Sequence, residues 1–354
     1  MFLAIKEIKY SKLRYTLIIG IMFLISFMVF MLSGLANGLS RQFSQAVIDW
    51  HAKTVVMSEE SNRILAASQL SLDNLKEVDG KSKVPLTVYS GSVKDKNNKT
   101  NISVFGTEKG AFFLPKTTSG SSFKKDNEIT ISQNLADVGF KVGDTISLGS
   151  DNTKLKVVGI TKATYYQATP VLYTTTKTVT DLKFGDKAFK NNKNYPINAI
   201  LTDATDTHIS SKSLDKMSSQ KFIESIPGYT AQDITLKAMI YFLFIIAVAI
   251  IGIFMYVITL QKTAIFGVMK VQGISDWFIS KSIIAQSFLV GFIGVTLSGI
   301  VSYALQFGLP KAMPFAVNLP QWLIYGGILI IMSILGGIFS ILTVRKVDPI
   351  KAIG

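Results

Sequence analysis

Cysteine is absent from this 354-residue chain, and histidine occurs only as His51 and His208. Without cysteine no disulfide can stabilise an exported part of the protein, which must therefore fold around an apolar core. Two histidines exclude a multi-histidine metal site. The pattern G-x-x-x-x-G-K-[ST] is also missing, so the chain cannot bind ATP through a P-loop. The sequence shows no nucleophile–base constellation and no paired carboxylates, which predicts a protein that is not an enzyme.

Charge is missing from four long stretches, which cover residues 15–40, 238–260, 282–310 and 312–344. A helix needs about 20 apolar residues to cross the hydrocarbon core of a bilayer, and each stretch is long enough. The sequence therefore predicts an integral membrane protein with one crossing before, and three crossings after, a large insert at 41–237. The first stretch exceeds the apolar region of a signal peptide and shows no clear A-x-A site, so we expect it to remain as a crossing.

The net charge of +14 follows the pattern of membrane topology and does not indicate nucleic-acid binding. Outside residues 41–237 there are 11 lysines and arginines against 3 aspartates and glutamates, and these cations flank the apolar stretches. Positive charge marks the cytoplasmic side of a membrane. We therefore expect 1–14, 261–281 and 345–354 to be cytoplasmic, and the insert and the 310–320 loop to be extracellular.

The segments outside the crossings carry their own patterns. Residues 1–14 alternate apolar side chains with lysines at near-helical spacing, which predicts a cytoplasmic amphipathic helix along the membrane surface. Alternating strand patterns separated by polar turns predict a mixed α/β fold for the insert. Within the insert, 206–224 is polar with sparse apolar residues, and we expect one or two helices there.

The crossings are rich in glycine, and Gly34 and Gly38 form a G-x-x-x-G pattern near the outer end of the first one. Small residues let helix backbones approach closely, so we expect tight helix packing. No crossing contains a charged residue, although proton- and ion-coupled carriers usually need acidic or basic groups on their pathway. Energy for any transport must therefore come from another subunit.

Three segments resemble FtsX/MacB-type permeases of ABC transporters. QKTAIFGVMKVQGIS at 261–275 is similar to the family's coupling segment, VDPIKAI at 347–353 to its terminal D-P-x-x-A motif, and 128–160 to the MacB-type core domain. The one-plus-three spacing of the crossings also matches, and the resemblance covers essentially the whole chain. It implies four transmembrane helices, an extracellular α/β MacB-type core domain between the first and second helix, and a separate ABC ATPase as partner.

Within this family the chain resembles the permeases of haem-regulated transporters of Gram-positive bacteria. The matching segments are MFLAIKEI at 1–8, LSGLANGL at 32–39, MPF at 313–315 and VDPIKAIG at 347–354. The resemblance implies a homodimer in the cell membrane with two copies of an ATPase, and haem as cargo rather than as a cofactor. It favours haem efflux by mechanotransmission, in which the helices move the outside domain.

The sequence is also compatible with two other functions. Permeases of peptide, antimicrobial-peptide and lipoprotein exporters share the same architecture. An FtsX-like transmitter of signals to a cell-wall hydrolase is the second alternative, although its insert is typically smaller than 41–237.

The candidate coupling residues lie in the 261–281 loop, which is the one cytoplasmic connection long enough to protrude. A short amphipathic helix there could place its apolar face in a cleft of the ATPase. Its predicted contact residues are Ile265, Phe266, Val268, Met269 and Lys270.

The candidate haem contacts are three side chains outside the crossings. Ferric haem needs an axial donor, which His, Met or Tyr can supply when cysteine is absent. The resemblance implies haem contacts for Tyr166 and Tyr229. His51 is a third candidate because it follows the first crossing, beside Trp50, at the expected outer membrane surface. Tyr and Trp are also enriched at membrane interfaces without binding any ligand, so this alternative stays open.

Overall fold

The structure is a computed structural model that describes residues 2–80, 82–95, 98–148, 153–187, 189, 192–310 and 313–345. The chain forms two compact units. One comprises Met1–Gly38 with Asp233–Gly354, and the other comprises Leu39–Gln232. The D-P-x-x-A motif at 347–353 lies outside the described residues.

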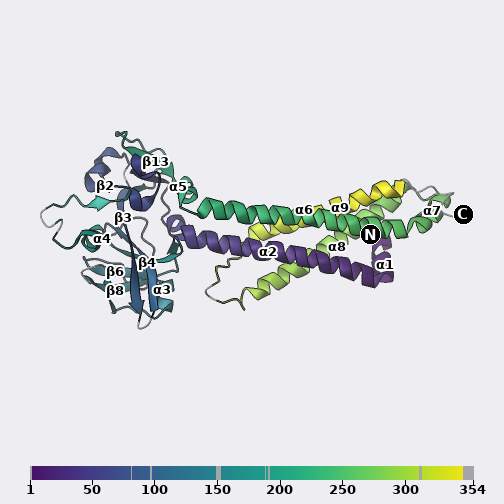
Figure 1. The fold of residues 1–354 in the computed structure, drawn as a ribbon, viewed down its shortest axis with the longest axis horizontal. Helices are drawn as coiled ribbons and strands as arrows, with labels where there is room; N and C mark the ends of the chain where they lie inside the picture. The colour runs from purple at the N-terminus through teal and green to yellow at the C-terminus, as the bar shows by residue number, and fades with distance from the viewer. Residues whose placement is uncertain are drawn as a thin grey trace. The chain divides into compact units, whose positions relative to one another are not determined.

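The first unit is helical, and its long helices confirm the four predicted crossings. Within the described residues, four helices are long and apolar enough to span a bilayer, one near the N-terminus and three in the last third. Figure 1 shows them gathered into one bundle. The helices are α1 (Phe2–Tyr10), α2 (Lys12–Asp49), α6 (Tyr229–Gln261), α7 (Thr263–Val271), α8 (Asp276–Leu305) and α9 (Leu319–Arg345).

Apolar side chains from all four long helices meet in one core. Met22 of α2, Ile251 of α6, Val290 of α8 and Leu329 of α9 are fully buried there. Small polar side chains also connect these helices. The Ser333 hydroxyl of α9 donates a hydrogen bond to the Ser287 carbonyl of α8 at 2.7 Å. In hydrocarbon such groups must find partners within the protein, which fixes how α8 and α9 pack.

The G-x-x-x-G pattern of α2 packs against the connection between α8 and α9. A Cβ at Gly34 would overlap the ring of Phe315, and a Cβ at Gly38 would overlap the Pro314 carbonyl. The Ala316 amide donates to the Gly34 carbonyl at 3.0 Å, and the Asn37 amide donates to Gln321 at 2.7 Å. The predicted close approach is therefore present, but its partner is a loop and not a helix.

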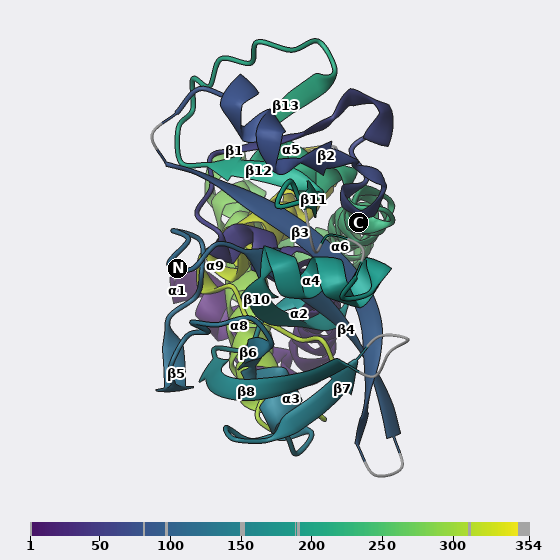
Figure 2. The ribbon, with the colours of Figure 1, turned by 90° about the vertical axis from the view of Figure 1, so that its left-hand side faces the viewer.

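The second unit is the extracellular α/β domain, which confirms the predicted fold class. Its main sheet has the strand order β13-β1-β12-β3-β4-β10-β6-β8-β5. In Figure 2 the long strand β3 runs through the domain, with β1 and β12 on one side and β10, β6 and β8 on the other. The strands are β1 (Thr54–Ser58), β2 (Leu70–Ser71), β3 (Lys83–Asp95), β4 (Asn98–Thr107), β5 (Thr117–Gly120), β6 (Glu128–Ser132), β7 (Thr145–Leu148), β8 (Thr153–Thr161), β9 (Tyr165–Tyr166), β10 (Thr169–Thr175), β11 (Pro196–Ile197), β12 (Ala199–Thr202) and β13 (Leu214–Ser218). Its helices are α3 (Gln133–Asp137), α4 (Thr176–Phe184) and α5 (Ser219–Ser225), with 3₁₀ turns at Glu59–Ser61, Leu65–Ala67 and Leu72–Glu77.

Strand alternation divides the apolar residues of β3 and β4 between two cores. Successive side chains of a strand point to opposite faces of the sheet. Val88 and Phe105 therefore pack in one cluster with Trp50, whereas Val93 and Val104 pack in another. Helix α4 covers the second cluster, and residues at the C-terminal end of α2 cover the first.

The helical prediction for 206–224 is wrong for its first part. Strand β13 (Leu214–Ser218) pairs antiparallel with β1, and helix α5 begins only at Ser219. Leu214 and Met217 are buried whereas Lys216 is exposed. Sheet pairing with a distant segment overrides the weak local preference of a polar stretch.

Candidate functional site

The C-terminal end of α2 is built into the extracellular domain. The last eleven residues of this helix, from Leu39 onwards, belong to the second unit. Ala46 and Val47 are buried in the domain core with Trp50, and Phe43 packs against it. These residues recur at helical spacing, so the polar sequence after residue 40 continues the helix by presenting an apolar face. This spacing in the sequence indicates that the helix continues past residue 40, whereas the absence of charge alone places its end there.

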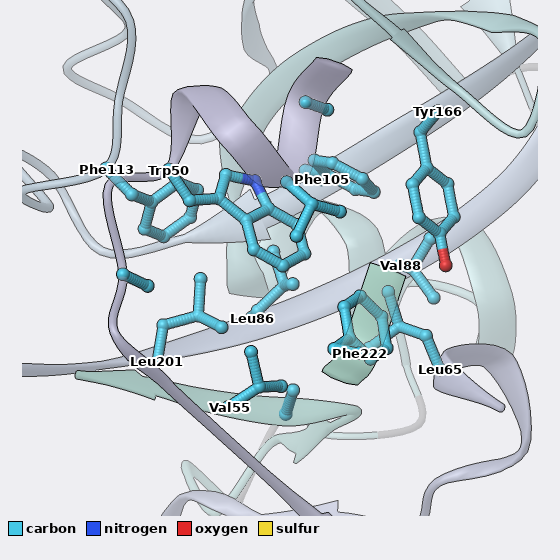
Figure 3. Close-up of a cluster of buried hydrophobic side chains, with 14 of the residues drawn as sticks. Trp50, Val55, Leu65, Leu86, Val88, Phe105, Phe113, Tyr166, Leu201 and Phe222 are labelled. Carbon is cyan, nitrogen blue, oxygen red and sulfur yellow. The ribbon is translucent and has the colours of Figure 1, made fainter. Parts of the chain in front are cut away.

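Trp50 is the centre of this core, where three aromatic rings surround it (Figure 3). Its ring centroid lies 5.7 Å from that of Phe105, 6.1 Å from Phe113 and 5.9 Å from Phe222. The indole is completely buried. Trp50 is therefore a core residue of the extracellular domain, which folds around it.

Replacing Trp50 with alanine is expected to destabilise the extracellular domain by about 3–5 kcal/mol, because a large buried ring leaves a cavity. Hydrogen exchange of peptides from 54–58 and 199–202 in the full-length protein measures this loss. The matched control is Trp277→Ala, since Trp277 is 69% exposed. Equal protection in the two variants would contradict the central position of Trp50.

The turn between β9 and β10 fastens the domain to α2. Gln167 donates its backbone N–H to the Phe43 carbonyl at 3.1 Å, and Ala168 donates to the Gln42 carbonyl at 2.8 Å. Both turn residues have left-handed backbones, with φ of 48° and 60°. Such conformations are unfavourable for residues other than glycine and persist where surrounding contacts fix them. The turn thus holds the residue that precedes it, Tyr166, in a defined place.

Tyr166 lies in the same aromatic core. Its ring packs edge-on against Phe105 with centroids 5.3 Å apart, and in Figure 3 its hydroxyl points toward Val88 and Leu65. The side chain also lines a cavity of about 390 Å³ together with Phe43 and other residues. Burial raises the pKa of the Tyr166 phenol above its ordinary value. The hydroxyl is therefore neutral at physiological pH, and an iron ligand would have to replace its proton.

Tyr229 begins α6 and contacts the same end of α2. Its hydroxyl lies 3.0 Å from the Ser40 hydroxyl, and its ring packs against the core that contains Tyr166. The two candidate tyrosines therefore adjoin one cluster, at the points where α2 and α6 join the domain. His51 differs from the two tyrosines because its side chain is exposed. It lies just after the end of α2, with a backbone φ of 52°. It does not line the cavity beside Tyr166.

Helix α7 divides the predicted coupling residues into two faces. Ile265 is 55% exposed and Val268 is 45% exposed. Phe266 is only 8% exposed and, with Met269, packs in the core of the helical unit. Of the five predicted residues, Ile265 and Val268 are therefore the apolar ones that remain available to a partner.

Two ion pairs fix the segments around α7. Lys270 pairs with Asp276 at 2.9 Å, which ties the end of α7 to the first turn of α8. Lys262, at the junction of α6 and α7, forms an ion pair with Glu7 of α1 and is 8% exposed. The N-terminal helix is thus attached directly to the segment that carries the exposed residues.

Comparison with known proteins identifies the family. Residues 16–214 match the model of the MacB-like periplasmic core domain, and residues 237–349 match that of the FtsX-like permease C-terminal region. The chain therefore belongs to the FtsX/MacB-type family of ABC transporter permeases.

Individual relatives cover the full length of the chain. A hemin transport system permease protein, HrtB, of Staphylococcus haemolyticus is 30% identical over 100% of this chain and 99% of its own. The same protein of Staphylococcus epidermidis is 30% identical with the same coverage. An uncharacterized ABC transporter permease of Mycobacterium tuberculosis is 24% identical over 100% of this chain and 99% of its own.

Proposed function

We propose that this ABC transporter permease moves haem out of the membrane, driven by a separate ATPase. The supporting observation for the cargo is the full-length similarity to hemin permeases at 30% identity. The protein would act as a homodimer in the cell membrane of a Gram-positive bacterium. Both termini and α7 would be cytoplasmic, consistent with the lysines and arginines that flank the crossings.

Mechanotransmission is the mechanism we propose, and the continuity of α2 supports it. This helix runs without a break from Lys12 to Asp49, so the helix that crosses the membrane continues from Leu39 onwards into the extracellular domain. A rotation or tilt of the crossing would therefore move the β9–β10 turn and Tyr166 with it. The charge-free crossings offer no ion pathway of their own, which agrees with movement powered from outside the bundle.

Chemistry supports the proposed cargo in addition to similarity. Haem is flat and apolar and partitions into lipid, so a permease can take it from the membrane without an aqueous channel. The turn after Tyr166 and the hydroxyl of Tyr229 contact the C-terminal end of α2, which supports a place for both tyrosines on such a route. We propose that they contact haem when it leaves the bilayer, with Tyr166 as the residue that lines a cavity.

The function is tested with the permease and its ATPase reconstituted together in lipid nanodiscs. Haemin is expected to stimulate ATP hydrolysis, and ATP is expected to lower the haemin content of the membrane. Cells lacking the permease should lose tolerance to haemin and regain it with the intact gene. If haemin neither stimulates hydrolysis nor leaves the membrane, haem is not the cargo.

The double variant Tyr166→Phe, Tyr229→Phe is expected to weaken haemin binding by about 100- to 10,000-fold, since each of the two hydroxyls that bind a charged centre contributes about 1.5–3 kcal/mol. Absorbance of the purified protein titrated with haemin measures the change, including loss of the tyrosinate-to-iron band. Tyr195→Phe, elsewhere in the same domain, is the matched control. An unchanged spectrum together with unchanged haemin tolerance would remove both tyrosines from the site.

A further inference from the structure

A groove in the extracellular domain extends from Tyr166 along the face of β3 and β4. The cavity of about 390 Å³ beside Tyr166 is lined mainly by apolar groups, among them Phe43, Ile64 and Pro227. A second, open cavity of about 630 Å³ is lined by hydroxyl and amide side chains of β3, β4 and β10. Ser90 and Gln167 line both cavities, so the two adjoin and are together called the groove here. Lys94 and Lys99 line neither cavity and lie further along β3 and β4.

The polarity of the groove changes steadily along its length. Residues directly opposite each other in an antiparallel pair share a face, and so do pairs two residues further along. The pairs on this face, in order, are Val88 with Phe105, Ser90 with Ser103, Ser92 with Asn101, and Lys94 with Lys99. The face therefore passes from the aromatic core through hydroxyl and amide groups to two cations.

The last of these pairs is unusual, because it places two like charges opposite each other. Lys94 and Lys99 are both exposed, and like-charged partners in directly opposed positions destabilise a sheet. An anion bound between them would relieve this repulsion. The hydroxyls of Ser90 and Ser92 and the amide of Asn101 supply hydrogen-bond donors beside it.

We infer that this groove binds a planar apolar dicarboxylate, with its apolar body against Phe43 and Tyr166 and its carboxylates toward Lys94 and Lys99. Haemin has this chemistry, because its two propionates leave one edge of an apolar macrocycle. Ser90 and Lys94 are about 13 Å apart along the strand, at about 3.3 Å per residue. Because a lysine side chain is long and flexible, its ammonium group can lie closer to Ser90 than this backbone distance. The inference rests on the proposed haem function and adds to it a fixed orientation of the cargo in the extracellular domain.

The test compares haemin with haemin dimethyl ester, which has the same macrocycle but no free carboxylates. Both are titrated into the full-length protein in nanodiscs. The charge reversal Lys94→Glu, Lys99→Glu is expected to weaken haemin binding by about three- to tenfold or more, given the modest strength of exposed ion pairs. It should leave binding of the ester unchanged. Lys154→Glu, Lys212→Glu is the control with the same change of net charge on exposed lysines.

A second variant, Ser92→Phe, fills the polar half of the groove and is expected to weaken binding of haemin and of the ester alike. Unchanged haemin affinity in the Lys94, Lys99 variant would overturn the inference, and so would an equal loss for haemin and its ester. Displacement of haemin by an equal concentration of oleate, a single-carboxylate lipid, would also overturn it. Failure of the unaltered protein to bind haemin would instead reject the proposed function itself, so the two failures are distinct.

Discussion

Replacing Ile265 with glutamate is expected to lower the affinity of the permease for its ATPase by on the order of 100-fold. Ile265 and Val268 lie exposed on one face of α7. Apolar anchors that become buried in a partner's cleft each contribute about 2 kcal/mol or more, and a buried carboxylate adds a desolvation penalty. ATP hydrolysis by the reconstituted complex should then lose its response to haemin. Co-purification of the ATPase with the permease measures the affinity directly.

Two further variants separate this effect from misfolding. Val142→Glu places the same charge on an exposed apolar residue of the extracellular domain and should leave coupling intact. Phe266→Ala removes a ring from the intramolecular core and is expected to lower the stability of the helical unit by about 3–5 kcal/mol. Full haemin-stimulated hydrolysis in Ile265→Glu would show that the ATPase binds elsewhere.

Replacing Gly38 with alanine is expected to lower the free energy of unfolding of the helical unit by about 1–3 kcal/mol, the range found for overpacked sites. The added Cβ would overlap the Pro314 backbone, which cannot move aside as a flexible side chain can. Because the Ala316 amide bonds to the Gly34 carbonyl nearby, the whole 313–316 segment should separate from α2. Thermal unfolding of the full-length protein in detergent measures the loss.

Gly20→Ala is the matched control on the same helix, since no atom lies within 4 Å of a Cβ built there. It should unfold at the temperature of the unaltered protein or slightly above. Gly34→Ala should behave more mildly than Gly38→Ala, because the atoms it meets belong to the Phe315 ring. Equal stability of the Gly20 and Gly38 variants would show that the 313–316 segment does not pack against α2.

The sequence named candidate residues whose roles stay predictions, and it did not describe their surroundings. Tyr166 and Tyr229 stood out only by resemblance, and 63 positions separate them in the sequence. The structure packs both against one aromatic cluster because β9 and the start of α6 each adjoin the end of α2. Trp50, which follows the first crossing in the sequence, is the centre of that cluster.

The coupling helix shows the same limit at the level of single side chains. Its amphipathic pattern predicted a contact face that included Phe266 and Met269. Those two residues pack on the helices of their own chain, and Ile265 and Val268 face outward. A local pattern cannot distinguish burial within the chain from burial against a partner, because both favour the same apolar residues.

The sequence by itself determined the four crossings, the single insert between them and the class of the insert. These follow from long-range absence of charge and from local periodicity, which are properties of contiguous residues. Only the tertiary structure decided where α2 ends, what the Gly34 and Gly38 pair packs against, and that Ser90 and Tyr166 line one cavity. Those features depend on strand register and on contacts between residues far apart in the chain, and neither leaves a local signature in the sequence.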